Sequence, residues 1–181
     1  FNNPFGACPT CTGLGTFLKV DPRLIIPDES LPLSGGAVKA SGWNSGEDNS
    51  IAMMYYQGLA DYYGFDLSTP YKDLPEEAKK AVLYGTGGKK LKLTRNTAWG
   101  GGAYEAPFEG IVTNLERRYK ETNSDWARAE IEACMSERDC PDCHGARLKP
   151  ESLAVTVGGI NINQLTAMSV SGALEFLTNL E

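Results

Sequence analysis

The sequence predicts an α+β fold in which a small base, stapled by four cysteines, carries an inserted domain of helices and a small antiparallel sheet. Two copies of one motif, Cys-Pro-x-Cys-x-Gly, at residues 8–13 and 140–145 predict the base. About 128 residues separate the copies, and they alternate helix-capping patterns with a strand pattern, which predicts a folded insert. We therefore expect a base of residues 1–20 and 136–181 and an insertion domain of residues 21–135.

The candidate metal ligands are the four cysteines of these motifs, Cys8, Cys11, Cys140 and Cys143. Two residues between the cysteines of a pair let both sulfurs reach one ion, and two pairs make the four-sulfur site that is typical of structural zinc. Closing a loop of ~130 residues costs roughly 1.7 kcal/mol more than closing one of ~20. Zinc binding in small modules supplies about 10–16 kcal/mol, so one structural zinc ion is the expected cofactor. The alternative is that each pair binds together with cysteines outside this chain.

The second motif also fits the Cys-x-x-Cys-His pattern of a c-type haem, and His144 is the only histidine of the chain. The first motif has Thr12 at that position, so a haem would leave Cys8 and Cys11 without a role. Haem-based electron transfer is therefore the weaker hypothesis, and His144 is expected to be an outer donor or a surface residue. Cys134, the fifth cysteine, is expected to be a buried thiol on a helix.

Cysteines clustered in this way, with an odd total of five, favour a reducing, cytoplasmic setting over a secreted disulfide framework. No apolar run approaches membrane-spanning length and no signal peptide opens the chain, so a membrane is not an expected partner. The chain begins at Phe1 without a Met and ends at Glu181 within a helical pattern. We therefore expect it to be a piece of a longer protein.

The first half of the chain predicts one short strand and two helices. Residues 17–20 form the strand, and the prolines and glycines that follow predict an extended loop with a strand at about 31–38. After a polar loop at 44–49, Asn49 or Ser50 caps a helix from Ile51 to about Tyr63, which Gly64 ends. Its core side is expected to carry Ile51, Met54, Tyr55, Leu59 and Tyr62. The second helix runs from Pro75 to Gly85, with an apolar side of Ala78, Ala81, Val82 and Tyr84.

The second half predicts a hairpin, two helices and a small C-terminal unit. Residues 89–95 alternate polar and apolar side chains, as a half-buried strand does, and residues 104–108 form the returning strand after a flexible tip at Gly100 to Gly102. Helices are expected at about 110–120 and, capped by Asn123 or Ser124, at 125–135. Residues 153–162 predict a hairpin that turns at Gly158-Gly159, and a last helix starts at Ser169 or Ser171.

Positive charge is concentrated in one stretch of an acidic chain. The net charge is −6, but residues 85–120 carry seven bases against three acids. Such asymmetry indicates a face for an acidic partner, and bases beside Trp99 and Tyr104 suit phosphate contacts and base stacking. The candidate nucleic-acid ligands are Lys89, Lys90, Lys92, Arg95, Arg117, Arg118 and Lys120. The structural alternatives are lysines that protect a strand edge and cations that serve the C-terminal end of a helix dipole.

The sequence contains no arrangement typical of a catalytic site. Residues 85–90, Gly-Thr-Gly-Gly-Lys-Lys, lack the spacing of a phosphate-binding loop and precede a strand. Residues 33–36, Leu-Ser-Gly-Gly, look like a transporter-type ATPase signature, but no amphipathic helix follows them. One histidine and scattered carboxylates do not make a nucleophile and base, so we expect no enzyme activity from this chain.

Four segments carry a resemblance to a known family. They are residues 1–15, which begin Phe1-Asn2-Asn3-Pro4-Phe5-Gly6 and include the first motif, residues 108–110, residues 114–122 (Asn-Leu-Glu-Arg-Arg-Tyr-Lys-Glu-Thr), and residues 140–148. Together they resemble the UvrA family, the damage-sensing ATPases of bacterial nucleotide excision repair, and the similarity runs along essentially all of the chain.

The resemblance implies that the chain is the second zinc module of the first half of such a protein, together with its insertion domain. It implies duplex and damaged DNA as a partner, a homodimer of the parent protein, and UvrB bound through another segment. ATP would bind only in parts of the parent that are missing here. The acidic net charge departs from a simple DNA clamp. The competing hypothesis is a chaperone-like zinc domain that binds unfolded protein, which usually has four such motifs where this chain has two.

Overall fold

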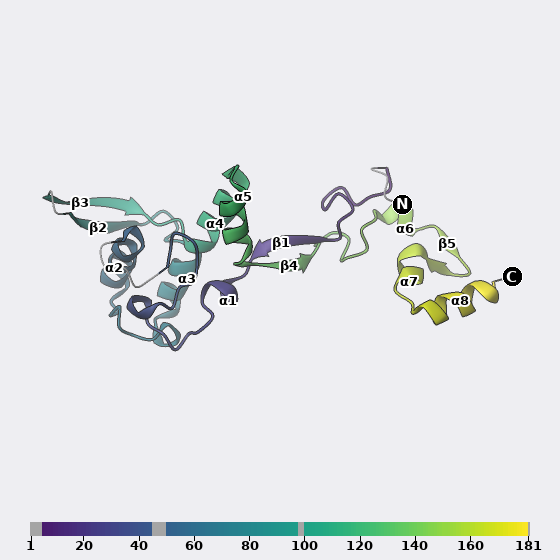
Figure 1. Cartoon of the computed structure of the whole chain (residues 1–181), viewed down its shortest axis with the longest axis horizontal. Helices are drawn as coiled ribbons and strands as arrows, with labels where there is room; N and C mark the ends of the chain where they lie inside the picture. Colours follow the sequence, from purple (N-terminus) through teal and green to yellow (C-terminus); the bar gives the residue numbers. More distant parts are fainter. Residues whose placement is uncertain (1–4, 45–49, 98–99, 181) are drawn as a thin grey trace. The chain divides into compact units, whose positions relative to one another are not determined.

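The computed structural model describes residues 5–44, 50–97 and 100–180, and the chain divides into two compact units. The first unit contains residues 1–18 and 137–181, and the second contains residues 19–136. The expected polar loop at 44–49 lies outside the described residues except for Asn44. Strands β1 (Thr16–Val20) and β4 (Met135–Asp139) form a two-stranded sheet, and the chain passes from one unit to the other within each of them (Figure 1).

The second unit is a mixed helical domain with one long hairpin, as the α+β class predicts. Its core is built from apolar side chains of all its helices and of the hairpin. Between β1 and β4 its elements in chain order are α1 (Pro22–Ile25), the 3₁₀ turns η1 (Leu33–Gly35) and η2 (Tyr71–Asp73) on either side of α2 (Ile51–Tyr63), then α3 (Glu76–Tyr84), β2 (Lys90–Thr97), β3 (Gly100–Pro107), α4 (Ile111–Glu121) and α5 (Asp125–Glu132).

Helix α2 begins and ends where the sequence predicts. The Ser50 hydroxyl accepts a hydrogen bond from the Met53 N–H at 3.1 Å, and Gly64 ends the helix at a φ of 72°. The predicted core side is wrong in part, because Ile51 and Tyr62 are exposed. The core side is set instead by tertiary partners, since the buried residues are Ala52, Tyr56, Gly58, Leu59 and Ala60. Tyr84 was expected on the apolar side of α3 but is also exposed, whereas Ala78, Ala81 and Val82 are buried as predicted.

Strands β2 and β3 form an antiparallel hairpin whose inner face packs on α2 (Figure 1). Leu91 and Leu93 are fully buried, which confirms the predicted alternation. The close approach needs Gly58, because a Cβ at that position would lie 2.8 Å from Leu93 Cδ2. The expected flexible tip at Gly100 to Gly102 is wrong, because these residues pair with Thr97 to Arg95 as part of β3.

Two further expectations are corrected, and one is confirmed. Strand β1 ends at Val20 as predicted, and the short helix α1, which was not predicted, follows because Asp21 caps it and Pro22 occupies its first turn. Residues 31–38 form no strand: Pro32 lacks a backbone donor, and Leu33–Gly35 is a 3₁₀ turn that Gly36 ends at a φ of 88°. The helix predicted at 125–135 ends at Glu132, and Met135 begins β4, because pairing with β1 takes over the backbone there.

The first unit ends in a small hairpin and short helices. Strands β5 (Thr156–Val157) and β6 (Ile160–Asn161) turn at two glycines of positive φ, and α8 (Val170–Thr178) is capped by Ser169, as predicted. Helices α6 (Pro150–Leu153) and α7 (Ile162–Thr166) were not predicted. Asn161 and Gln164 form a capping box that starts α7.

Within the described residues, none of the helices combines the length and the apolar character needed to cross a bilayer.

Asp21 joins the two ends of the second unit. Its side chain is 3 % exposed and accepts hydrogen bonds from Arg23 Nη2 at 2.8 Å and from the Ser136 hydroxyl at 3.0 Å. Its N–H donates to the Cys134 carbonyl at 2.9 Å. The Arg23 guanidinium, with the Arg23 N–H and the Ser136 hydroxyl, holds the pKa of Asp21 well below its usual range. Asp21 therefore connects the start of the second unit to its end through hydrogen bonds.

We predict that Asp21→Asn lowers the melting temperature by roughly 4–8 °C, because the amide loses the paired charge and part of the cap. Asp28→Asn is the matched control, since Asp28 is exposed and its side chain bonds only Ser30. The folded-state pKa of Asp21 is depressed, so its contribution is complete above about pH 4 and is lost as the pH falls toward the folded pKa. Equal melting temperatures of the two variants near neutral pH would contradict this role.

Candidate metal centre and candidate nucleic-acid interface

The two cysteine motifs lie side by side in the first unit, although they are 132 residues apart. Each motif hydrogen-bonds to the segment that follows the other. The Cys8 N–H donates to the Arg147 carbonyl at 2.9 Å, and the Cys140 N–H donates to the Gly15 carbonyl at 2.8 Å. A bridge between Ala7 and Leu148 continues this pairing. Backbone contacts of this kind bring all four cysteines to one place.

The four sulfurs are placed as ligands of one ion. Cys8 Sγ lies 3.9 Å from Cys140 Sγ, Cys11 Sγ lies 3.6 Å from Cys143 Sγ, and all four lie within 4.8 Å of one another. A tetrahedral site with bonds of about 2.3 Å has sulfurs about 3.8 Å apart. A disulfide would need a separation of about 2.05 Å, and all four cysteines are free and buried. The cluster could therefore hold a metal ion.

The two motifs share one backbone conformation. Thr12 and His144, which follow the second cysteine of each pair, have φ values of 51° and 48°, and the next residues, Gly13 and Gly145, have φ values of 87° and 85°. This left-handed pair turns the chain so that both sulfurs of a motif point the same way. The His144 side chain is exposed and is not a member of the sulfur cluster. The repeat in sequence is thus a repeat in structure.

The surroundings of the cluster favour partial ionisation. Burial opposes ionisation of Cys11, but the Gly15 N–H, which donates to its sulfur at 3.2 Å, and the neighbouring thiols outweigh burial and lower the pKa of Cys11 to about 7. Burial, together with smaller contributions from the neighbouring thiols, raises the pKa of Cys143 to about 12. One thiolate thus makes the next one harder to form. A bound cation would remove this opposition and allow all four to ionise.

One contact across the motifs was not predicted. The Thr10 hydroxyl donates a hydrogen bond to the Asp142 carboxylate, and both residues are exposed beside the cysteines. They occupy the same position between the two cysteines of their motifs, so aligning the two copies would have paired them. The fifth cysteine, Cys134, belongs to the second unit and not to the cluster; it is buried and donates to the Lys39 carbonyl at 3.4 Å.

The candidate nucleic-acid ligands fall on two elements. Lys89, Lys90 and Lys92 are exposed at the start of the hairpin, and among the described residues none of the three forms an ion pair. Arg95 lies further along β2, opposite Gly102. Because side chains alternate along a strand, Lys90 and Lys92 lie on the outer face, opposite to buried Leu91. The start of the hairpin therefore presents three exposed ammonium groups that form no ion pair with the described residues.

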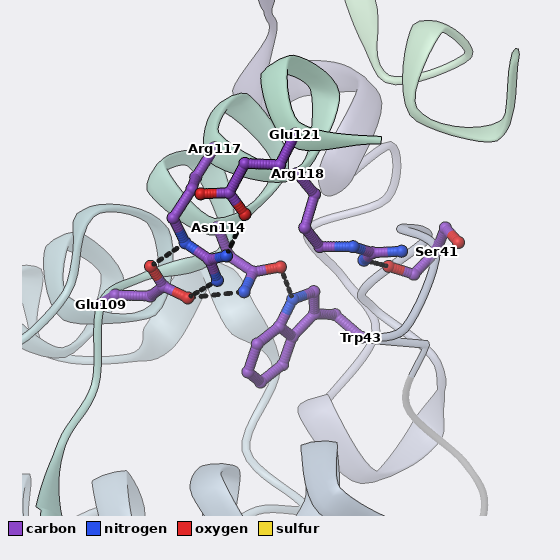
Figure 2. Close-up of polar contacts among 7 residues, drawn as sticks. All are labelled: Ser41, Trp43, Glu109, Asn114, Arg117, Arg118 and Glu121. Atoms are coloured by element: carbon purple, nitrogen blue, oxygen red, sulfur yellow. Dashed lines mark hydrogen bonds and ion pairs between the residues drawn. The ribbon is translucent and has the colours of Figure 1, made fainter. Parts of the chain in front are cut away.

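The candidate bases on α4 are in part occupied by other residues (Figure 2). Arg117 donates to Glu109 through Nε at 3.2 Å and Nη2 at 2.7 Å, and to Glu121 through Nη1 at 2.8 Å. Arg118 points to the other side and donates to the Ser41 carbonyl at 2.7 Å. Lys120 is exposed. Arg117 holds the pKa of Glu109 below its usual range, so this ion pair is charged at neutral pH.

Comparison with known proteins connects both features to one family. A family model described as the UvrA DNA-binding domain matches residues 21–133. UvrABC system protein A of Clostridium perfringens is 45% identical over 180 residues, which is 99% of this chain and 19% of the relative. The same protein of Bacillus subtilis is 43% identical over 185 residues, again 99% of this chain and 19% of the relative. The chain therefore spans about a fifth of the length of the curated relatives it matches.

A solved structure has a similar fold. The crystal structure of UvrA2 from Deinococcus radiodurans matches with a TM-score of 0.66 and 25% sequence identity. The match covers 98% of this chain and 22% of that one. Both units of the chain thus have counterparts in a longer protein of known structure.

We predict that Cys140→Ser removes a sulfur ligand and lowers metal affinity by more than the roughly 10–100-fold that the loss of an outer contact costs. The probe is Co²⁺, whose charge-transfer absorption reports sulfur ligation. Cys134→Ala is the matched control, because this buried cysteine lies outside the cluster. Loss of Co²⁺ binding in the control, or its retention in Cys140→Ser, would contradict the site.

Proposed function

The chain belongs to the UvrA family, and from this we propose that it is a non-catalytic DNA-binding module of a nucleotide excision repair protein. A base of residues 1–20 and 136–181 binds one structural zinc ion, and an insertion domain of residues 21–135 contacts duplex or damaged DNA. The observation that carries the proposal is the match of residues 21–133 to the UvrA DNA-binding domain. The convergence of two cysteine pairs that flank that segment in the sequence supports the base.

Zinc is the proposed ion, bound by Cys8, Cys11, Cys140 and Cys143. Four thiolates in a closed site suit zinc, because soft sulfur ligands and a tetrahedral arrangement are its preferred structural environment. A site without an open position has no place for a reacting water, so the role of the ion is to hold the base together. The four sulfurs meet in one cluster, which leaves none for the thioether bonds of a haem.

The proposed DNA contact is sequence-independent. Lys89, Lys90 and Lys92 are exposed and form no ion pair with the residues that the structure describes, and lysine side chains bind phosphates as point charges. Arg95 and Lys120 extend the proposed set. Arg117 and Arg118 belong to the same basic stretch, but Arg117 is engaged by Glu109 and Glu121 and Arg118 by the Ser41 carbonyl, so neither is proposed as a direct phosphate ligand. The chain as a whole is acidic, with a net charge of −6, so binding would be confined to a small basic area.

The activities of the longer relatives are proposed for other segments of such a protein. ATP binding and hydrolysis, formation of the parent homodimer and binding of UvrB would all lie outside this chain. The chain itself contains a single histidine, which is exposed beside the cysteine cluster. We propose no reaction for this chain.

We predict that the 181-residue chain binds duplex DNA with a Kd of about 10⁻⁴–10⁻⁶ M that weakens steeply with salt. The triple variant K89A/K90A/K92A should bind more weakly and should lose about 0.9 from the slope of log affinity against log salt for each phosphate contact removed. The measurement is a fluorescence anisotropy titration of one duplex at several salt concentrations.

The matched control is K39A/K72A/K80A, which removes the same charge from three exposed lysines elsewhere on the second unit. It should keep the wild-type slope. Equal slopes for the two triple variants, or an affinity that ignores salt, would refute the assignment of the hairpin lysines.

A further inference from the structure

The base of the β2–β3 hairpin is closed by one buried threonine. Thr86 is 4 % exposed, and its hydroxyl donates to the Lys89 carbonyl at 2.6 Å and accepts from the Phe108 N–H at 3.2 Å. The Thr86 N–H donates to the Phe108 carbonyl at 2.9 Å. The residues just before β2 and just after β3 are therefore held together by a single side chain and its own backbone.

The hairpin base is also tied to helix α4. Glu109 follows Phe108 directly, and its carboxylate accepts two hydrogen bonds from Arg117 and one from Asn114 Nδ2 at 2.6 Å (Figure 2). Arg117 is fixed in turn by Glu121, one helical turn further along α4. A forked contact of this kind restrains direction as well as distance, because two parallel N–H groups meet two oxygens.

The same contacts reach the turn that contains Trp43. Asn114 is 9 % exposed, and its Oδ1 accepts a hydrogen bond from Trp43 Nε1 at 2.9 Å. The Trp43 ring packs edge-on against Phe108, with centroids 5.2 Å apart. In Figure 2 the Asn114 side chain lies between Glu109 and Trp43. A chain of polar and aromatic contacts thus links the hairpin base, α4 and the 41–43 turn.

The backbone is closely packed at the hairpin base. Gly85 and Gly110 both have positive φ values, and a Cβ on Gly110 would lie 2.3 Å from Gly85 N. A Cβ on Gly85 would lie 2.6 Å from the Glu109 carbonyl. The end of α3 and the start of α4 therefore cross at a distance that only glycine allows. A lost side-chain contact here cannot be replaced by closer packing.

Arg117 is poorly suited to bind phosphate itself. Its Nε and both terminal nitrogens are engaged, and the two carboxylates beside it outnumber its single positive charge. A phosphate would have to displace a carboxylate to reach it. The hairpin lysines form no ion pair with the described residues, although Glu105 lies opposite Lys92 in the register of the hairpin.

We propose that Arg117 is a positioning residue: it holds Glu109 and Asn114 so that the hairpin presents Lys89, Lys90 and Lys92 in one fixed orientation. This inference rests on the proposed DNA contact of those lysines. A hairpin held in its binding orientation avoids the entropy cost of ordering it during association, so the restraint supports affinity without touching the ligand.

The test compares Arg117→Lys and Arg117→Ala with wild type in the full 181-residue chain. Lysine keeps the positive charge but cannot form the forked contact with Glu109. Both variants should therefore weaken duplex binding by roughly 2- to 30-fold, the range of residues that act on a site without touching its ligand, and both should keep the wild-type salt slope. Wild-type affinity in Arg117→Lys, with a slope reduced by about 0.9 in Arg117→Ala, would make Arg117 a phosphate ligand and overturn the inference.

Hydrogen exchange supplies a readout that does not depend on DNA. The Thr86 and Phe108 amides should exchange faster in Arg117→Lys and at the wild-type rate in K89A/K90A/K92A. Arg128→Ala is the control for general loss of stability, because Arg128 packs over Tyr119 and donates to the Thr122 carbonyl on the far end of α4. Arg128→Ala should leave the exchange rates of both amides and the affinity for DNA unchanged. Exchange as fast as in Arg117→Lys, or an equal loss of affinity, would overturn the inference.

The two proposals can fail separately. Unchanged exchange of both amides in Arg117→Lys overturns the positioning role whatever the lysines do. If exchange accelerates but K89A/K90A/K92A binds DNA like wild type, the hairpin is anchored as inferred and the assignment of the DNA contact to its lysines is refuted.

Discussion

The base depends on four cysteine thiols, from segments 132 residues apart, that lie within 4.8 Å of one another. Their convergence requires the segment before β1 and the segment after β4 to run side by side, and the backbone bonds of Cys8 and Cys140 show that they do. An insert whose ends are already joined pays little extra loop entropy for its length, because that cost grows only with the logarithm of loop size. The closed base can therefore carry a large second unit whose fold is independent of the cysteines.

The second unit also contains side chains that join segments distant in sequence. Asp21 hydrogen-bonds to Ser136 and so connects the start of the unit to its end, and Thr86 connects the two ends of the hairpin. In both places a buried polar side chain satisfies backbone or side-chain partners from distant positions, and within the described residues no buried side-chain nitrogen or oxygen lacks a partner. Such contacts specify one geometry, because each alternative leaves a buried group unpaired. For the proposed DNA contact, this rigidity would lower the entropy cost of ordering the hairpin during binding.

The distinction between free and occupied charge changes the view of the basic stretch. Seven bases between residues 85 and 120 look equivalent in the sequence, but two are engaged by other residues of α4 and its surroundings. Arg117 serves two carboxylates and Arg118 serves the Ser41 carbonyl, whereas the three hairpin lysines are exposed without an ion pair among the described residues. Net charge in a window therefore overstates the charge that is available to a phosphate.

The resemblance of its motifs identified the family from the sequence. Local chemistry also predicted the α+β class, the cysteine quartet, the ends of α2 and α3 and the alternation of β2, through ligand spacing, a capping hydroxyl, a terminal glycine or a period of two. Only the tertiary structure decided the core side of α2, the strand β4 and the roles of Arg117 and Arg118. Each of these depends on a partner in another element or loop: β2 against Gly58, β1 against Met135, Glu109 against Arg117 and the Ser41 carbonyl against Arg118. Local pattern cannot identify such partners, because packing and ion pairing are properties of neighbours in space.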